Sequence, residues 1–204
     1  AAGYDNNLPD DVKNLKSADE RKNAAKKTLE DAGYKLNGDY YEKDGQQVTF
    51  AYTLFGDGTT TKNRAAAIQK MCKDAGINLT LDSHPSSEFS KVLTSGSWDV
   101  CLFGWSGTAT SYDNGGQLYG SESGSNFSQQ GSAETDAMFA KVVSTKDFDE
   151  RMKLMNEAEK KMMATYAYLP VYTGPDCYVV KKGLANFGPA LFESVPATIV
   201  GWQK

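Results

Sequence analysis

Amphipathic stretches alternate with short apolar stretches along the first half of the chain. Residues 17–33 begin at Ser17, a residue type that caps helices well, continue with acidic residues and end at Gly33. Between these ends apolar side chains recur at helical spacing, at Ala25, Leu29 and Ala32. This pattern predicts an amphipathic helix.

The next segments follow first a strand pattern and then a helix pattern. Residues 48–55 come after an Asp44-Gly45 turn and are rich in β-branched and aromatic side chains, which predicts a strand. Residues 59–76 open with threonine, expected to cap a helix that stops at Gly76. Its apolar face consists of Ala65, Ile68, Cys72 and Ala75.

Two further strands complete the pattern. Residues 77–83 alternate apolar and polar side chains, and residues 98–105 form a short apolar run. Between them, an opening proline and the spacing of the apolar residues predict a helix over residues 85–97. Strand, helix, strand, helix and strand in this order is typical of βαβ units, so we expect an α/β fold with a mainly parallel or mixed sheet flanked by helices.

The composition changes after this unit. Residues 106–132 are rich in Gly, Ser, Thr, Asn and Gln, with a few aromatic side chains, and are too long for an ordinary connection. We expect a functional loop or a cluster of short irregular elements, and a flexible linker between two small units is the alternative.

The remaining residues predict two helices followed by strands. The helices are expected at 132–145 and 147–167, and the second carries a stripe typical of core packing, formed by Met152, Met155, Ala158 and Met162. Residues 168–173 and 177–183 are predicted to be closing strands. The tail from residue 184 has no clear period and is expected to need a partner segment.

Length and charge restrict the class of protein. A chain of 204 residues with 40% hydrophobic and 24% charged residues is typical of a soluble globular unit with one core. Its net charge of -4 and scattered basic residues argue against nucleic acid as a partner. No apolar run is long enough to cross a bilayer, and the first residues lack the signal-peptide pattern, which a processed or excised segment would also lack.

Candidate catalytic and metal-binding residues are sparse. The cysteines, Cys72, Cys101 and Cys177, lie far apart, and the single histidine, His84, has no neighbouring cysteine, so neither a metal nor another cofactor is expected. Three buried thiols are favoured, with a Cys101–Cys177 disulfide as the alternative in an extracellular protein. His84 precedes Pro85 and is interpreted as a polar cap rather than a catalytic base.

The acidic pairs and the glycine-rich segment have ordinary structural interpretations. Asp147/Asp149 and Glu157/Glu159 are spaced as on a solvated helix face, and residues 56–64 lack the spacing of a phosphate-binding loop. The chain is therefore expected not to be an enzyme, with a small hydrolase kept as the rival class.

A binding surface is predicted at the end of the strand over residues 98–105. In parallel α/β sheets ligands bind beyond the carboxyl ends of the strands, and this end carries Gly104, Trp105, Ser106 and Gly107. Glycines let a ligand approach the backbone, and an indole offers a flat apolar wall. The alternative is that Trp105 caps the core and the glycines form a turn.

A series of short motifs, in the same order, resembles the C-terminal lobe of the family 5 extracellular solute-binding proteins. The motifs are AAKKTLEDAGY, DGQQVTFAYTL, RAAAIQKMCKDAGINLTL, EFSKVLTSGSWDVCLFGWSG, GSNFS, RMKLMNEAEKKMMATYAYLPVY and GLANFGP. The resemblance implies a periplasmic-binding-protein-like (type II) lobe over residues 1–204, with residues 106–132 forming a long loop region at the cleft. It also implies a two-lobed receptor of an ABC importer that acts outside the cytoplasm, either in a periplasm or as a lipoprotein at the cell surface.

The resemblance further implies partners and ligand contacts. The partners would be a peptide or other small solute, the membrane permease subunits, and the N-terminal lobe of a longer chain. Peptide-binding members carry an aspartate for the α-ammonium of the ligand at the position of Thr108, and Asp113 is the nearest substitute carboxylate. Gly104 to Thr108 and Asp113 are therefore candidate contacts, together with Asn126, whose first role is expected to be holding its loop. A sensory domain of a regulatory protein is the alternative function.

Overall fold

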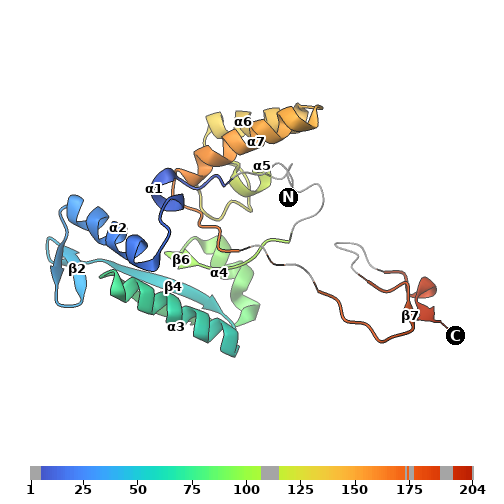
Figure 1. Cartoon of the computed structure of the whole chain (residues 1–204), viewed down its shortest axis with the longest axis horizontal. Helices are drawn as coiled ribbons and strands as arrows, with labels where there is room; N and C mark the ends of the chain where they lie inside the picture. Colours follow the sequence, from blue (N-terminus) through green and yellow to red (C-terminus); the bar gives the residue numbers. More distant parts are fainter. Residues whose placement is uncertain (1–5, 107–114, 173, 175–176, 189–194, 204) are drawn as a thin grey trace.

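The computed structural model describes residues 6–106, 115–172, 174, 177–188 and 195–203 (Figure 1). The helices, including short 3-10 turns, are α1 (Asp10–Lys13), α2 (Ala18–Asp31), α3 (Thr59–Asp74), η1 (Ser86–Glu88), α4 (Phe89–Ser95), α5 (Gly115–Tyr119), α6 (Ala133–Ser144), α7 (Phe148–Met163) and η3 (Ala197–Ile199). The strands are β1 (Lys35–Asn37), β2 (Tyr40–Lys43), β3 (Gln46–Gln47), β4 (Thr49–Phe55), β5 (Asn78–His84), β6 (Val100–Cys101), β7 (Leu184–Ala185) and β8 (Gly201–Trp202).

A parallel sheet with the order β5-β4-β6 confirms the predicted α/β class. Its central strand, β4, pairs in register with β5 along seven residues and with β6 at Tyr52↔Val100 and Thr53↔Cys101. The strand predicted over residues 98–105 is wrong in length, because only Val100–Cys101 pairs with the sheet. Beyond β6, Phe103 and Trp105 instead pack their rings against each other.

Helix α3 covers one face of this sheet. The cluster between them contains Tyr52, Leu54, Ala65 and Leu79, with Ile68, Cys72 and Leu102 packed against it. The predicted apolar face of α3 is therefore confirmed at its central positions. The predicted threonine cap is wrong: Gly58 holds the N-cap position, and no side chain caps the helix.

Helix α2 begins and ends as predicted. The Ser17 hydroxyl accepts from the Glu20 amide, and the Glu20 carboxylate accepts from the Ser17 amide, which together form a capping box. Gly33 follows the helix with a φ of +86°, a conformation that favours glycine. This helix lies next to the β1–β2–β3 hairpins, where the Tyr41 hydroxyl donates to Glu30 over 2.5 Å.

A second layer is formed by α5, α6 and α7 (Figure 1). The methionine stripe is confirmed as core, since Met152, Met155, Ala158 and Met162 are all buried. Part of the stripe packs against α5 and α6 in a cluster with Tyr119, Phe139, Val142 and Met163. Among its described residues, the long segment predicted over residues 106–132 thus includes the short helix α5, which joins this core.

The C-terminal part of the chain, residues 168–203, is called the arm here. In Figure 1 its residues 177–188 and 195–203 lie away from the helices α1 to α7 and from the parallel sheet. The closing strands predicted over 168–173 and 177–183 are wrong across their described residues, which pair with no strand. Only β7 and β8 pair within the described part of the arm, at Leu184↔Trp202 and Ala185↔Gly201. Without sheet partners, the apolar side chains of Leu169, Tyr172 and Val179 are largely exposed.

Candidate ligand-binding site

The carboxyl ends of the three parallel strands bring aromatic side chains together. β4 ends at Phe55, α4 begins at Phe89 just after β5, and Phe103 follows β6. The Phe55 and Phe89 rings meet edge to face with centroids 4.9 Å apart, and Phe89 meets Phe103 in the same way at 5.7 Å. The ends of all three strands are thereby joined by ring contacts.

Trp105 lies at the exposed end of these contacts. Its ring packs edge-on against Phe103 at 5.7 Å and lies nearly parallel to Phe127, at 6.0 Å and an interplanar angle of 14°. With 48% of its surface exposed, Trp105 is not a buried core residue. Flanking residues Gly104 and Ser106 are exposed as well. We call the set Phe55, Phe89, Phe103, Trp105 and Phe127 the aromatic row.

The other predicted contacts divide into two groups. Gly107, Thr108 and Asp113 lie outside the described residues. Asn126 is 7% exposed, and its amide donates to the Gly120 carbonyl at 3.1 Å and the Gln130 carbonyl at 2.8 Å. Its amide oxygen accepts from the Ser128 hydroxyl at 2.8 Å. Asn126 therefore holds its loop, as expected, and places the neighbouring Phe127 in the aromatic row.

Sequence reasoning missed most of the aromatic row. Phe55, Phe89, Phe103 and Phe127 stand far apart in the sequence and have no motif in common. The available signal was positional: Phe55 ends a strand, and Phe103 directly precedes the Gly104-Trp105 pair. Aromatic residues at the ends of adjacent parallel strands are brought to one edge of the sheet.

His84 is the polar neighbour of this row. Its Nε2 lies 2.7 Å from an Asp82 carboxylate oxygen, its Nδ1 lies 3.2 Å from a Glu88 carboxylate oxygen, and its ring faces Phe55 at 6.1 Å. Hydrogen bonds to Asp82 and then to Glu88 raise the pKa of His84 above its ordinary value. The prediction that His84 caps a helix is therefore wrong. The His84 side chain instead bridges β5 and η1, and no side chain caps η1.

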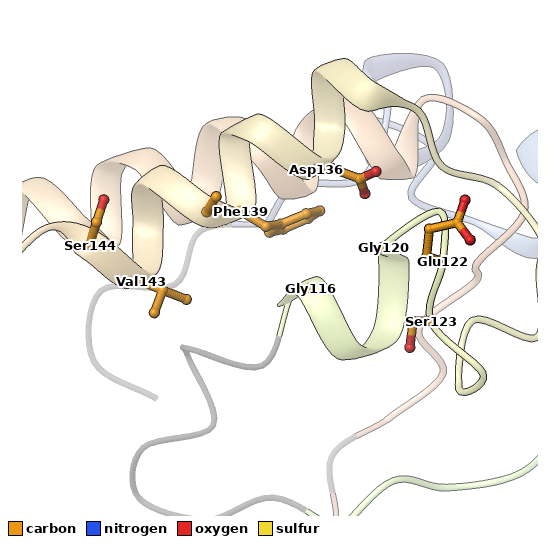
Figure 2. A pocket seen from close by; sticks show the side chains of 9 residues that line it. Gly116, Gly120, Glu122, Ser123, Asp136, Phe139, Val143 and Ser144 are labelled. Atoms are coloured by element: carbon orange, nitrogen blue, oxygen red, sulfur yellow. The ribbon is translucent and has the colours of Figure 1, made fainter.

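A separate open cavity of about 540 Å³ lies between α5 and α6 (Figure 2). Phe139, Ala140 and Val143 supply its apolar wall, and Glu122 and Asp136 lie at its rim. Asp136 accepts from the Ser121 amide at 2.9 Å and from the Ser121 hydroxyl, and the hydroxyl bond is the largest cause that lowers the pKa of Asp136. Of the sequence-predicted site residues that the structure describes, Gly104, Trp105, Ser106 and Asn126, none lines this cavity.

The thiols and carboxylates do not assemble a metal site within the described residues. Cys101 is a free thiol, which rules out the alternative Cys101–Cys177 disulfide in this structure. The favoured prediction of three buried thiols is also wrong, because Cys72 and Cys101 are half-buried and Cys177 is exposed. Burial raises the pKa of Cys101 to about 11, so the thiol stays protonated at neutral pH. Asp147 accepts from the Glu150 amide at 2.9 Å and caps α7, a structural role.

Helix length and polarity decide whether a helix can enter a bilayer. Across the described ranges, no helix combines the length and apolar character that a bilayer span requires.

Comparisons with known proteins agree on one family. The family model described as "Bacterial extracellular solute-binding proteins, family 5 Middle" matches residues 2–127. The oligopeptide-binding proteins OppA of Mycobacterium tuberculosis and Mycobacterium bovis are 30% identical over 181 residues, which is 88% of this chain and 30% of theirs. The chain thus spans about a third of the length of these relatives.

Solved structures share the fold. The oligopeptide-binding protein of Thermus thermophilus, solved with a pentapeptide, superposes with a TM-score of 0.73 at 19% identity, over 88% of this chain and 35% of that one. NikA of Brucella suis, solved with Fe(III)-EDTA, superposes with a TM-score of 0.61 at 24% identity, over 72% of this chain and 31% of that one.

Proposed function

Because the chain belongs to the family 5 bacterial extracellular solute-binding proteins, we propose that it is the C-terminal ligand-binding lobe of an ABC importer receptor. The lobe, residues 1–204, would close over a solute together with the N-terminal lobe of a longer chain. The closed receptor would then deliver the solute to the permease subunits in the membrane. On this proposal the protein acts outside the cytoplasm, either in a periplasm or as a lipoprotein at the cell surface.

The aromatic row is the observation that carries this proposal. Trp105 presents a half-exposed indole at the carboxyl ends of three parallel strands, the edge at which α/β folds bind ligands. Exposed Gly104 and Ser106 leave the backbone and a hydroxyl beside the indole within reach of a ligand. We propose Gly104, Trp105, Ser106, Gly107, Thr108 and Asp113 as ligand contacts and Asn126 as the support of the loop.

The proposed ligand is an oligopeptide or another small solute. Relatives named oligopeptide-binding proteins and a structure solved with a metal chelate support this range rather than one compound. The threonine at position 108 offers a hydroxyl but no charge to balance an α-ammonium in a closed cleft. A solute without a free amine is therefore as consistent with this lobe as a peptide.

The arm supports the need for a second lobe. Leu169, Tyr172 and Val179 are 70%, 75% and 98% exposed, a degree of apolar exposure that marks surfaces made for contact. The relatives are long enough to contain a further lobe that could make such a contact, since this chain covers 30% of their length. We propose that the N-terminal lobe covers the arm.

A binding role also fits the state of His84. A general base needs a ring nitrogen with an available lone pair, and both nitrogens of His84 face carboxylates, which favours the doubly protonated ring. We therefore propose a receptor and not a hydrolase. Measurable turnover of a bound solute that disappears in His84→Ala would contradict this.

The experiment that tests the function uses the longer protein of which this chain would be one lobe. Native mass spectrometry of that protein should detect a retained solute, and calorimetry with the identified solute should give saturable binding. The chain of 204 residues alone should bind the same solute weakly or undetectably, because it supplies only half of the contacts. Equally tight binding by the chain alone would contradict the two-lobe proposal.

A further inference from the structure

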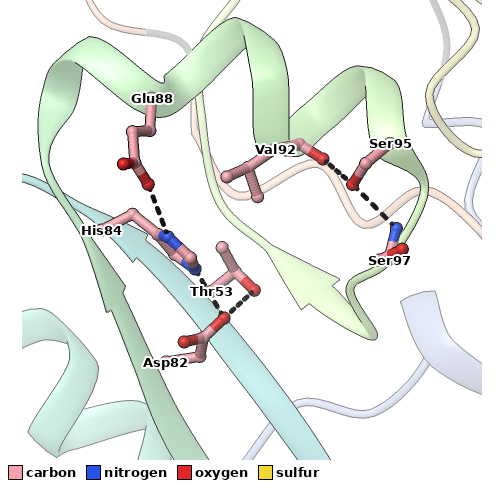
Figure 3. Close-up of polar contacts among 7 residues, drawn as sticks. All are labelled: Thr53, Asp82, His84, Glu88, Val92, Ser95 and Ser97. Atoms are coloured by element: carbon pink, nitrogen blue, oxygen red, sulfur yellow. Dashed lines mark hydrogen bonds and ion pairs between the residues drawn. The ribbon is translucent and has the colours of Figure 1, made fainter.

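His84 joins the end of a strand to the beginning of a helix. Asp82 and His84 belong to β5, whereas Glu88 is the last residue of η1 and directly precedes α4. The Nε2–Asp82 distance is 2.7 Å and the Nδ1–Glu88 distance is 3.2 Å, and Figure 3 shows the ring between the two carboxylates. The start of α4 is therefore tied to β5 by a single side chain.

This bridge contacts the aromatic row through Phe55. The His84 ring contacts Phe55 at 6.1 Å, and Phe55 meets Phe89, the first residue of α4, at 4.9 Å. Phe89 in turn meets Phe103, which packs against Trp105 at 5.7 Å. A shift at the beginning of α4 would move Phe89 and, through Phe103, the indole of Trp105.

We propose that His84 is a positioning residue for Trp105, acting through its bridge to Asp82 and Glu88, which fixes the start of α4 and the ring of Phe89. The inference rests on the proposed function of the aromatic row as a ligand wall. His84 itself need not touch the ligand; its effect is to hold the ring contacts that orient the indole.

The charges around His84 give this bridge a pH dependence. Among the described residues, the charged groups that face the ring are Asp82 from β5 and Glu88 from η1. Thr53 of β4 adds a hydroxyl 3.5 Å from the Asp82 carboxylate, and Phe55 and Phe89 are uncharged. Only the doubly protonated ring can donate to both carboxylates. Since the carboxylates raise the pKa of His84, the bridge is complete below the ordinary value of 6.5 and is lost as pH rises through the raised value.

NMR can follow both ends of this coupling in the same sample. His84 is the single histidine of the chain, so its ring signals report its protonation without overlap from another histidine. The indole signal of Trp105, identified with Trp105→Phe, should change with the same pH midpoint as His84. The indole of Trp98, which donates to the Leu93 carbonyl at 3.2 Å near the other end of α4, and that of Trp202 in the arm should stay constant.

Substitutions at the bridge distinguish positioning of Trp105 by His84 from a general effect of pH on the Trp105 signal. Asp82→Asn should lower the midpoints of His84 and Trp105 together, by more than Glu88→Gln does, because the bond to Asp82 is the larger cause of the raised pKa. His84→Gln should abolish the Trp105 transition. Asp74→Asn, which removes an exposed pair with Lys70, is the matched control and should leave both midpoints unchanged.

The inference is overturned if the Trp105 signal does not follow His84 in the wild-type chain, or if its midpoint stays fixed while Asp82→Asn moves that of His84. The wild-type titration decides the matter even if a variant fails to fold. It needs no ligand, so a longer protein that binds no solute would contradict the proposed function without affecting this result. Where a solute is bound, His84→Gln should weaken affinity by roughly fivefold or more.

Discussion

Aliphatic side chains are buried in the body of the molecule, the described residues before 168, and exposed in the arm. In the body, Leu93 of α4 is 1% exposed and Val142 of α6 is also 1% exposed. In the arm, Leu169 is 70% exposed and Val179 is 98% exposed. Both regions carry aliphatic side chains, but only the body has a surface against which to bury them.

The difference lies in periodicity and in partners. Apolar residues of the body recur at helix or strand spacing, so each element presents one face to a neighbouring element. The described residues 168–172 and 177–182 of the arm include no strand or helix. Tyr168, at the start of the arm, packs against the buried cluster of α5, α6 and α7, but residues 169–172 and 177–182 belong to neither buried cluster. This exposure motivates the proposal made above that the N-terminal lobe of a longer chain covers the Leu, Val and Tyr side chains of the arm.

Replacing a leucine by alanine in each region should give the largest difference in the free energy of unfolding. Leu93→Ala should lower the free energy of unfolding by about 2–5 kcal/mol, because it leaves a cavity next to α4. Leu169→Ala should change it by no more than about 0.5 kcal/mol in this chain. Urea unfolding followed by circular dichroism measures both.

The same pair also tests the proposal for the arm. In the longer protein, Leu169→Ala should become destabilising by about 1–3 kcal/mol, because its side chain would then be buried. An unchanged stability of the longer protein would show that Leu169 stays exposed there. A large loss in the short chain would contradict the exposed position of Leu169.

Buried and exposed asparagines provide the next contrast. Asn126→Ala should cost about 1–3 kcal/mol, because the Gly120 and Gln130 carbonyls lose a buried donor. Asn186→Gly is the corresponding change in the arm, where the amide donates to the Ile199 carbonyl at 2.7 Å in an exposed setting, and glycine accommodates the φ of +59° at this position. It should change the free energy of unfolding by no more than about 0.5 kcal/mol. Equal losses in the two variants would contradict this distinction.

Helix caps give the smallest effect. Ser17→Ala should lower stability by about 1 kcal/mol, because it removes the hydroxyl that accepts from the Glu20 amide. Thr59→Ala should be neutral within about 0.5 kcal/mol, since Gly58 rather than a threonine occupies the cap of α3. Thermal unfolding of the two variants measures both changes, and a larger loss for Thr59→Ala would contradict the position of the cap.

The sequence predicted those parts of the fold that depend on local patterns. The capped helix α2, the strands β4 and β5 and the methionine face of α7 follow from residues close in sequence. The length of β6 and the absence of strands over the described residues 168–172 and 177–182 depend on which segments pair in a sheet. No local sequence pattern encodes that pairing. A run such as Val179-Val180 has the composition of a strand whether or not a neighbouring strand is present.

The candidate site was predictable only where its residues are adjacent. Gly104, Trp105 and Ser106 could be proposed because they follow an apolar run. Phe55, Phe89 and Phe127 join Trp105 only through the parallel register of the sheet and the loop held by Asn126. The two carboxylates of the His84 bridge are close in sequence, but their convergence requires the turn from β5 into η1.

The placement of a ligand on the aromatic row is decided by the affinity of the longer protein for its retained solute, measured by calorimetry in two variants. Trp105→Ala should weaken binding by on the order of 30-fold, as expected when an aromatic anchor is removed. Val143→Ala, in the wall of the cavity between α5 and α6, should leave affinity unchanged. Wild-type affinity in Trp105→Ala, or a loss confined to Val143→Ala, would contradict the placement of the ligand on the aromatic row.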